Sequence, residues 1–283
     1  MQNLTNISVV KDILSRHGFT FSKSLGQNFI VNPSVCPRIA EEGGASAGTG
    51  VIEIGTGVGV LTAELAKRAD KVVAIEIDDR LIPVLSETLS DFDNVKIINE
   101  DVLKVDLNKV IEEEFSGMDV YVCANLPYYI TSPIIMSLLE SRLNIKAITV
   151  MVQKEAATRL TAELGTRDVG AVTVAVRYYS EPKLLFNVSR GSFMPSPNVD
   201  SAVIRLDIKN EQKVDDEKHF FKVVRAAFSQ RRKTLSNSLS SGLSMDKKTV
   251  IEAIKSAGLS ESIRPEQLSM EDFINIAKSV RKI

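Results

Sequence analysis

Tryptophan is absent from this chain, and histidine and cysteine occur only twice each. Two histidines, His17 and His219, are too few to favour a zinc site or a catalytic triad built on histidine. The two cysteines, Cys36 and Cys123, lie far apart in the sequence and in no metal-ligand spacing, so we expect both to be reduced and structural. These shortages argue against zinc chemistry, and no bound metal is expected.

Long apolar runs are also missing. No stretch of about 18 or more apolar residues suggests a membrane span, and the N-terminus lacks the basic and then apolar layout of a signal peptide. We therefore expect a globular protein of the cytoplasm. Its 283 residues, 44% of them hydrophobic and 25% charged, suffice for one large domain and a smaller one.

The net charge of −1 hides an uneven distribution of charge along the chain. Residues 218–283 contain 13 Lys and Arg against 6 Asp and Glu, a net charge of +7, which leaves −8 for residues 1–217. A module that contacts phosphates requires such a basic region, although an ordinary solvated helical surface would look the same. The polar segment 209–217 separates the two parts, so we predict domains of residues 1–209 and 217–283.

A predicted strand, a glycine-rich turn and a predicted helix follow one another in the first half of the chain. The β-branched segment 50–54 predicts the strand, and the turn of residues 55–59 follows it. This is the nucleotide-binding βα unit, in which Gly55 and Gly57 let the backbone approach a ligand. Glu76 ends the next predicted strand about 20 residues later, where a carboxylate accepts hydrogen bonds from ribose hydroxyls.

The spacing of the glycines in the turn indicates which cofactor it holds. A dinucleotide fingerprint requires Gly-x-Gly-x-x-Gly, whereas here the third glycine comes one residue early and Glu53 precedes the turn. This form suits a cofactor without a pyrophosphate, namely S-adenosylmethionine. Asp101 follows the third predicted strand, and its carboxylate would accept a hydrogen bond from the adenine amino group of that cofactor. The alternative is that Asp101 is the N-cap of a helix beginning at Val102.

An apolar strand and a polar turn adjoin in the middle of the chain. Residues 120–123 predict a buried strand, and Pro127 ends its pairing, so the turn should lie at the carboxyl end, where open α/β sheets bind ligands. The Asn125 side-chain oxygen and the Leu126 carbonyl would both accept hydrogen bonds from one planar amino group. The Tyr128 ring offers a face for a flat base. An exocyclic amine of a nucleobase is the ligand that fits.

Two further strands, residues 184–188 and 201–208, are predicted to pair across a long loop that contains prolines and Phe193. An aromatic side chain in such a loop is often a packing plug, but Phe193 would also supply the second face for a flipped base. Segment 170–178 suits a strand and a helix alike. Other helices are predicted near residues 7–16, 32–42, 60–69, 131–143, 153–166, 220–228, 246–257 and 270–280, and other strands near 71–77, 94–99 and 146–152.

Several motifs in a fixed order carry a resemblance to a known family. They are Leu25-Gly-Gln-Asn-Phe29, Glu53-Ile-Gly-Thr-Gly-Val-Gly59, Glu76, Asp101, Asn125-Leu-Pro-Tyr128, Phe193-Met-Pro-Ser-Pro-Asn-Val-Asp-Ser201 and Phe228-Ser-Gln-Arg-Arg-Lys-Thr-Leu235. On these motifs the chain resembles the small-subunit ribosomal RNA adenine N6,N6-dimethyltransferases over essentially its whole length. The resemblance implies an α/β fold, a Rossmann-like class I methyltransferase sheet of seven mostly parallel strands, with a small C-terminal helical domain.

The resemblance also implies site residues and a substrate. S-adenosylmethionine would lie at Asn28, Ile30, Gly55, Glu76, Asp101 and Asn125, beside Gly57. The substrate would be two adjacent adenosines in a hairpin loop near the 3′ end of 16S rRNA, within the immature small ribosomal subunit, and we expect a monomer. We interpret Arg231, Arg232 and Lys233 as phosphate contacts that continue the helix beginning near Phe220.

Two alternatives stay open. The related macrolide-resistance methyltransferases modify an adenine of 23S rRNA, in the large subunit, with the same pocket, and the basic helical domain does not separate the two enzymes. A non-catalytic ribosome-assembly or transcription factor would keep the fold for RNA binding alone, although the intact cofactor residues count against it.

Overall fold

The computed structural model describes residues 2–21, 26–230 and 232–281. The chain forms two compact units, residues 1–157 with 181–208, and residues 158–180 with 209–283. Residues 158–180 thus belong to the second unit although they precede the last strands of the first. The division into domains at residues 209–217 stays a prediction about which parts fold independently.

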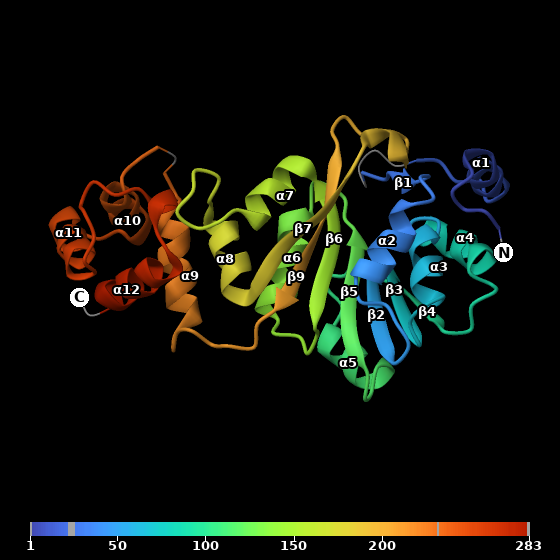
Figure 1. The fold of residues 1–283 in the computed structure, drawn as a ribbon, viewed down its shortest axis with the longest axis horizontal. Coiled ribbons are helices and arrows are strands. Elements are labelled where there is room, and N and C mark those ends of the chain that lie inside the picture. Colours follow the sequence, from blue (N-terminus) through green and yellow to red (C-terminus); the bar gives the residue numbers. More distant parts are fainter. Residues whose placement is uncertain (1, 22–25, 231, 282–283) are drawn as a thin grey trace. The chain divides into compact units, whose positions relative to one another are not determined.

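The main sheet has seven strands in the order β4-β3-β2-β5-β6-β9-β7 (Figure 1). The strands are β2 (Thr49–Ile54), β3 (Lys71–Glu76), β4 (Val95–Asn99), β5 (Asp119–Asn125), β6 (Ala147–Gln153), β7 (Ser180–Val188) and β9 (Ser201–Ile208). Neighbouring strands from β4 to β6 are parallel, and β9 lies antiparallel to β6 with β7 on its other side. The predicted sheet of seven mostly parallel strands is confirmed.

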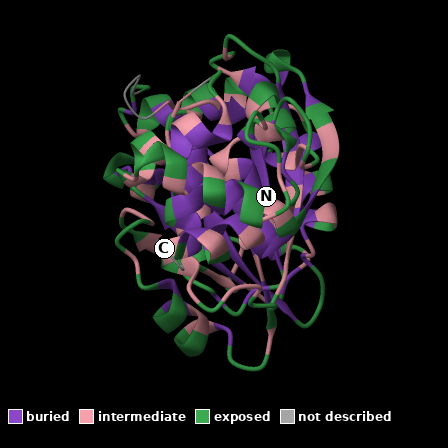
Figure 2. Ribbon diagram, turned by 90° about the vertical axis from the view of Figure 1, so that its left-hand side faces the viewer, coloured by how far each residue is buried: buried purple, intermediate pink, exposed green. Residues whose placement is uncertain are grey.

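The central strands are buried along their whole length. Every residue of β2 is buried, and so is every residue of β6 except Gln153. Such continuous burial is typical of parallel strands covered on both faces, and Figure 2 shows buried residues in the interior with exposed residues at the outside. The helices of the first unit are α1 (Ile7–Arg16), α2 (Val35–Glu42), α3 (Val60–Ala66), α4 (Ile82–Thr88), α5 (Leu107–Glu114) and α6 (Thr131–Glu140).

The order of the strands decides where a ligand would bind. Because β2 to β5 are parallel, their carboxyl ends meet at one edge of the sheet. The chain builds outward from β2 to β3 and β4, and then returns to place β5 on the other side of β2. Open α/β sheets bind ligands at such a switch point, outside the carboxyl ends of the strands.

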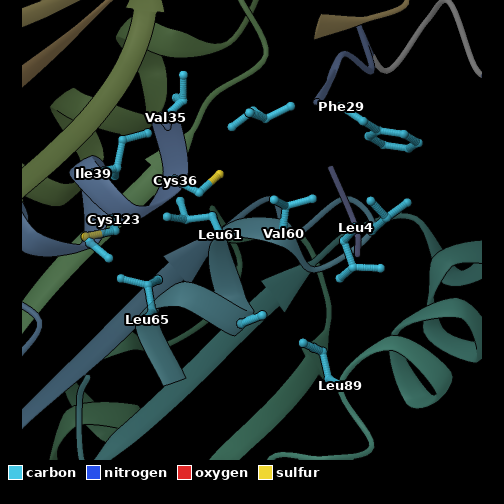
Figure 3. Close-up of a cluster of buried hydrophobic side chains, with 14 of the residues drawn as sticks. Leu4, Phe29, Val35, Cys36, Ile39, Val60, Leu61, Leu65, Leu89 and Cys123 are labelled. Carbon is cyan, nitrogen blue, oxygen red and sulfur yellow. The ribbon is translucent and has the colours of Figure 1, made fainter. Parts of the chain in front are cut away.

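A hydrophobic cluster packs the N-terminal segment and α2 against α3 and the sheet (Figure 3). Ile39 and Leu65 are fully buried in it, and Leu4 and Phe29 join it from the N-terminal segment. Cys123 is also fully buried there, and neither it nor Cys36 forms a disulfide. Burial raises the pKa of Cys123 to about 12, so its thiol stays protonated and unreactive, as a structural cysteine should be.

Two local differences from the predicted elements have simple causes. Helix α2 begins at Val35 rather than at Asn32, because the Asn32 side chain accepts hydrogen bonds from the backbone N–H and the hydroxyl of Ser34 at 3.0 and 2.9 Å. These bonds hold a turn in front of the helix. Segment 170–178, which the sequence leaves undecided, is helical as α8 (Ala171–Tyr179).

The second unit is helical. Besides α8 and the end of α7 (Lys154–Thr161), it contains α9 (Glu217–Ala227), α10 (Leu235–Leu243), α11 (Lys247–Ser256) and α12 (Met270–Arg281). Helix α10 was not predicted, because its many serines favour turns, and buried Leu235 and Leu239 stabilise it through packing. Helices α9 and α10 approach closely, since a Cβ atom at Gly242 would lie 2.7 Å from that of Ala226.

None of the helices within residues 2–21, 26–230 and 232–281 combines the length and the hydropathy that crossing a bilayer requires.

Candidate active site

A cavity opens at the carboxyl ends of β2, β3, β4 and β5, and residues 26–29 of the N-terminal segment form one of its walls. It brings together eight residues that the sequence predicts for the site: Asn28, Gly55, Gly57, Glu76, Asp101, Asn125, Leu126 and Tyr128. Ile30 lines a smaller adjoining pocket, together with Asn28, Glu53 and Asn125. The predicted residues come from five separate stretches of the chain, so the fold alone makes them neighbours.

The glycine turn is joined to Glu76 by hydrogen bonds. The Gly57 N–H and the Thr56 hydroxyl both donate to Glu76 Oε2, at 3.1 and 3.0 Å, and the Asp78 N–H donates to Oε1 at 2.9 Å. Gly57 has a φ of +57° and lies against Phe29, so a side chain there would be strained and crowded. The turn and the carboxylate form one rigid unit at the ends of β2 and β3.

Glu76 is buried with only 5% of its surface exposed. Burial raises the pKa of its carboxyl, and the hydrogen bonds from Asp78, Gly57 and Thr56 oppose that rise. A carboxylate has about four acceptor positions, and donors among the described residues occupy three of them. One acceptor position of Oε1 therefore remains for a ligand.

Asp101 lines the cavity at the end of β4, but it does not cap a helix. Its Oδ1 accepts a hydrogen bond from the Leu103 N–H at 3.0 Å in a turn. The next helix is α5, which begins at Leu107 and is capped by Asp106. The alternative of a helix starting at Val102 is therefore wrong, since turn residues separate Asp101 from α5.

The Asn125 amide is oriented by the N-terminal segment. Its Nδ2 donates to the Asn28 carbonyl at 3.3 Å, which leaves Oδ1 as an acceptor at the end of β5. The neighbouring Leu126 is held to β6 by a hydrogen bond of 3.3 Å from its N–H to the Met151 carbonyl, and Pro127 follows it. Two hydrogen bonds, one from the Asn125 side chain and one from the Leu126 backbone, thus fix the turn that carries both predicted acceptors of an amino group.

Tyr128 is held in place at its hydroxyl. The hydroxyl oxygen lies 2.7 Å from the hydroxyl of Ser201, a fully buried residue at the start of β9. Burial raises the pKa of the half-buried Tyr128, and the hydrogen bond with Ser201 offsets part of the rise. The phenol therefore stays neutral, and its ring lines the cavity in a fixed position.

The wall formed by residues 26–29 is fastened to the turn after β3. Gln27 Nε2 donates to Asp78 Oδ2 at 2.7 Å, and Arg80 donates to the same carboxylate through Nε at 2.8 Å and Nη2 at 2.6 Å. Arg80 is the main reason that the pKa of Asp78 lies below its usual range. The Asp78 carboxylate therefore stays ionised and ties the wall to the strand that carries Glu76.

Phe193 lies beside the cavity without lining it. It begins β8 (Phe193–Met194), which pairs antiparallel with β1 (Phe29–Ile30), so that Phe193 lies opposite Ile30. The ring is 5% exposed and belongs to the hydrophobic cluster of the first unit. This is the arrangement of a packing plug, the alternative that the sequence leaves open, and a role of Phe193 toward a base stays a prediction.

A family model for ribosomal RNA adenine dimethylase matches residues 18–282. The chain belongs to this family. The resemblance drawn from the motifs is thus confirmed, and with it the prediction of an rRNA adenine dimethyltransferase, an enzyme whose substrate is rRNA. Family membership sets aside the reading of the fold as an RNA-binding factor without catalysis.

Curated relatives and solved structures agree with this assignment. The chain is similar to ribosomal RNA small subunit methyltransferase A of Geobacillus thermodenitrificans, with 52% identity over 276 residues, or 95% of this chain and 94% of that one. A dimethyladenosine transferase from Plasmodium falciparum has a similar structure, with a TM-score of 0.75 and 27% identity over 90% of this chain and 98% of that one. The 23S rRNA methyltransferase ErmE gives 0.67 and 28%, over 90% and 100%.

Glu53 is a buried acid at the smaller pocket. The side chain is fully buried, and neither carboxylate oxygen has a hydrogen-bond partner within the described residues. Burial is the main cause that raises the pKa of Glu53 to about 8, and the Thr62 hydroxyl, which faces the carboxyl without reaching hydrogen-bond geometry, offsets a part. At neutral pH this carboxyl is mostly protonated.

The predicted phosphate contacts do not continue a helix. Arg231 lies outside the described residues, whereas Arg232 and Lys233 are exposed in a segment between α9 and α10. Helix α9 ends at Ala227 because the Ser229 hydroxyl binds the Ala226 carbonyl at 2.7 Å. Arg232 has a φ of +70°, a conformation outside any right-handed helix. The expectation of a helix through these residues is wrong, and their RNA contacts stay a prediction.

Two residues that support the site, Ser201 and Asp78, were not predicted from the sequence. Ser201 and Asp78 act on the cavity through hydrogen bonds to Tyr128 and Gln27. Ser201 closes one of the family motifs, so that motif was the available signal, but nothing in it names the partner. Asp78 had no such signal, since an Asp after a strand is ordinarily a turn residue.

Proposed function

We propose that the protein dimethylates the N6 amino groups of two adjacent adenosines in a hairpin loop near the 3′ end of 16S rRNA, within the immature small ribosomal subunit. The observation that carries the proposal is the Asn125 amide, oriented by the Asn28 carbonyl so that Oδ1 is left to accept. The names of relatives that are 52% and 46% identical support the choice of small-subunit rRNA. The enzyme would act in ribosome biogenesis, in the cytoplasm, as a monomer.

The cavity fits S-adenosylmethionine as the methyl donor. Glu76 keeps one acceptor for a ribose hydroxyl, and Asp101 lies at the end of the next strand for an adenine amino group. Glu53 is a buried carboxyl without a partner among the described residues, and a bound group with N–H donors would satisfy it. The residues that would hold the cofactor are Asn28, Ile30, Gly55, Gly57, Glu76, Asp101 and Asn125. When bound, the cofactor supplies a methyl group on a positively charged sulfur.

The residues at the end of β5 would activate the target amine without a strong base. The lone pair of an adenine amino group is delocalised into the ring, which makes the nitrogen a weak nucleophile. Asn125 Oδ1 and the Leu126 carbonyl would accept its two hydrogens and so favour a pyramidal nitrogen whose lone pair is available. The same acceptors disperse the positive charge that develops on the nitrogen.

The Tyr128 ring would hold the flipped adenine by stacking, which contributes about 1–3 kcal/mol per base. Its hydrogen bond with Ser201 fixes the ring before the base arrives, so little rotational freedom is lost on binding. Phe193 would cover the second face of the base only if β8 moved out of its pairing with β1. Arg231, Arg232 and Lys233 would bind rRNA phosphates.

The test is single-turnover methylation with labelled S-adenosylmethionine on three substrates: immature small subunits, mature small subunits and 23S rRNA. Mass spectrometry of the modified fragment would count unmodified, mono- and dimethylated adenosines. We expect two dimethylated adenosines in the immature small subunit alone. The second candidate is a 23S rRNA methyltransferase, favoured by the TM-score of 0.67 to ErmE, and methylation of 23S rRNA alone would establish it instead.

A further inference from the structure

Tyr129 is a large aromatic side chain left in the open at the rim of the cavity. Its neighbour Tyr128 is half-buried, whereas Tyr129 is 60% exposed and still lines the cavity. An exposed ring next to a buried site has no role in the packing of the core. Exposed aromatic rings at the edge of a nucleic-acid site commonly serve as surfaces on which bases stack.

The Tyr129 ring packs against the cavity wall that residues 26–29 form. A Cβ atom at Gly26 would lie 3.4 Å from Tyr129 Cδ1 and 3.7 Å from Pro127 Cβ, so the bare backbone of Gly26 lies directly against this ring. Gly26 has a φ of +58°, which a residue with a side chain would adopt only under strain. The ring thus rests on backbone on one side and is open to solvent on another.

The two tyrosines are tethered to different parts of the fold. The Tyr128 hydroxyl is bonded to Ser201 on β9, whereas the Tyr129 ring lies over Gly26 in the N-terminal segment. The Tyr128 ring therefore lies in the cavity and the Tyr129 ring lies at its mouth, although the two residues are consecutive in the chain. A target base that enters the cavity stays covalently joined to its flanking nucleotides, which must remain at the mouth.

We propose that the Tyr129 ring is the stacking surface for the base that flanks the target adenosine on one side. The proposal rests on the proposed function, because it requires an RNA base in the cavity. It gives Tyr129 a role in capturing the RNA strand and none in the transfer of the methyl group. Tyr128 receives the extruded base, and Tyr129 holds the strand from which it came.

The experiment combines Tyr129 variants with abasic substrates. Immature small subunits are assembled with rRNA whose synthetic 3′ segment carries an abasic residue on the 5′ side of the two target adenosines, on their 3′ side, or on neither. Wild type, Tyr129→Ala and Tyr129→Phe are compared by kcat/KM and by the single-turnover rate at saturating RNA. Leu184→Ala removes another exposed apolar side chain, 53% exposed and outside the cavity lining, and is the matched control.

We expect Tyr129→Ala to lower kcat/KM on unmodified particles by about 5- to 150-fold, the range for losing one base–aromatic stack. Tyr129→Phe, which keeps the ring, and Leu184→Ala should behave as the wild type. The single-turnover rate at saturating RNA should change little in any of them. One of the two abasic substrates should lower wild-type kcat/KM by the same factor and should not lower that of Tyr129→Ala any further.

Two results would overturn the proposal: wild-type kcat/KM for Tyr129→Ala, or an abasic penalty that multiplies with the effect of Tyr129→Ala. A thermal melt and the cofactor affinity of each variant distinguish a folding defect from a missing stack. If the wild type methylates 23S rRNA alone, the proposed small-subunit substrate fails, and the same variants and abasic positions are then compared on that RNA. Quenching of 2-aminopurine at the flanking position, seen with the wild type and absent with Tyr129→Ala, is an independent measurement of the stack.

Discussion

The cavity of the first unit and the basic segment of the second unit differ in how their functional groups are held. In the cavity, Glu76, Asn125 and Tyr128 are fixed by hydrogen bonds with the backbone or with neighbouring side chains before any ligand binds. Arg232 and Lys233 are exposed in a connecting segment. Chemistry requires groups placed in advance, whereas attraction to phosphates acts over a distance and tolerates mobile side chains.

This difference predicts separate effects on the rate of methyl transfer and on the affinity for the ribosomal particle. Changes at Glu76, Asp101 and Asn125 should alter methyl transfer or cofactor binding and leave the affinity for the ribosomal particle nearly unchanged. Changes in the basic segment should do the reverse. A variant that alters both would show that the two regions act as one site.

Asn125→Ala should have the largest effect on the reaction. We expect the single-turnover rate to fall by about 10²–10³, the scale for losing one group placed in advance for the transition state. Saturating S-adenosylmethionine is required, because Asn125 also lines the pocket assigned to the cofactor. Particle affinity, measured by filter binding, should match the wild type. Near-normal dimethylation by Asn125→Ala would contradict the proposed activation of the amine.

Glu53→Gln should remove a pH dependence of stability. The pKa of Glu53 is raised by burial from 4.5 to about 8, so the folded state keeps a proton that the unfolded state loses. The contribution of Glu53 to wild-type stability is full below pH 4.5 and is lost as the pH rises to 8. The free energy of unfolding of Glu53→Gln, measured relative to that of the wild type, should therefore rise with pH, by on the order of 3 kcal/mol between pH 4.5 and 7. Urea unfolding at several pH values measures it, and parallel curves would refute the assignment.

Glu76→Ala and Asp101→Ala should each weaken S-adenosylmethionine binding by roughly 10- to 100-fold, because each removes a carboxyl group that accepts hydrogen bonds. Isothermal titration measures the change. Glu76→Ala also removes three internal hydrogen bonds, so its melting temperature must be compared with that of Asp101→Ala, which loses one within the turn. Wild-type affinity in both variants would mean that the cofactor binds elsewhere.

Ser201→Ala and Tyr128→Phe should share one defect, since each breaks the same hydrogen bond and keeps the ring. We expect kcat/KM to fall by about 3- to 10-fold in each. The double variant should be no worse than either single variant, and Ser201→Thr, which keeps the hydroxyl, should retain activity. Additive effects would show that Ser201 acts on the site by another route.

The Arg232→Gln, Lys233→Gln double variant should have the smallest effect on methyl transfer. It should weaken particle binding and flatten its salt dependence, by a log–log slope of roughly 0.7–0.9 for each phosphate that the variant no longer neutralises. Lys247→Gln, Lys248→Gln is the matched control, because these lysines are also exposed in the second unit. Equal slopes for the two double variants would assign Arg232 and Lys233 to ordinary solvated surface.

Local patterns predicted most of the elements and the composition of the cavity. The β-branched runs identify β2 and β3, and the positions of Glu76, Asp101 and Asn125 at strand ends follow from those strands. In a parallel sheet the carboxyl ends share one edge, so side chains at those ends come together without further information. For this reason the glycine turn and the three polar residues were found from sequence.

The sequence by itself did not determine which partners hold these groups. Tyr128 is 73 residues from Ser201, and Asn125 is 97 residues from Asn28. No periodicity relates residues so far apart, and a serine or an asparagine has many partners that would satisfy it equally well. Tertiary structure chooses the partner, because only the packed chain fixes which polar atoms face one another.

Local reasoning went furthest from the structure at two places. Phe193 is predicted to lie in a long loop that contains prolines, yet the pairing of β8 with β1 buries it. The basic stretch after Phe228 contains good helix formers, yet α9 ends at Ala227, where the Ser229 hydroxyl donates a hydrogen bond to the Ala226 carbonyl. Propensity and hydrophobic pattern thus determine which elements form and what chemistry they carry. Hydrogen bonds such as that of Ser229 decide where an element ends, and pairing between distant segments decides which side chains are buried and which are free to act.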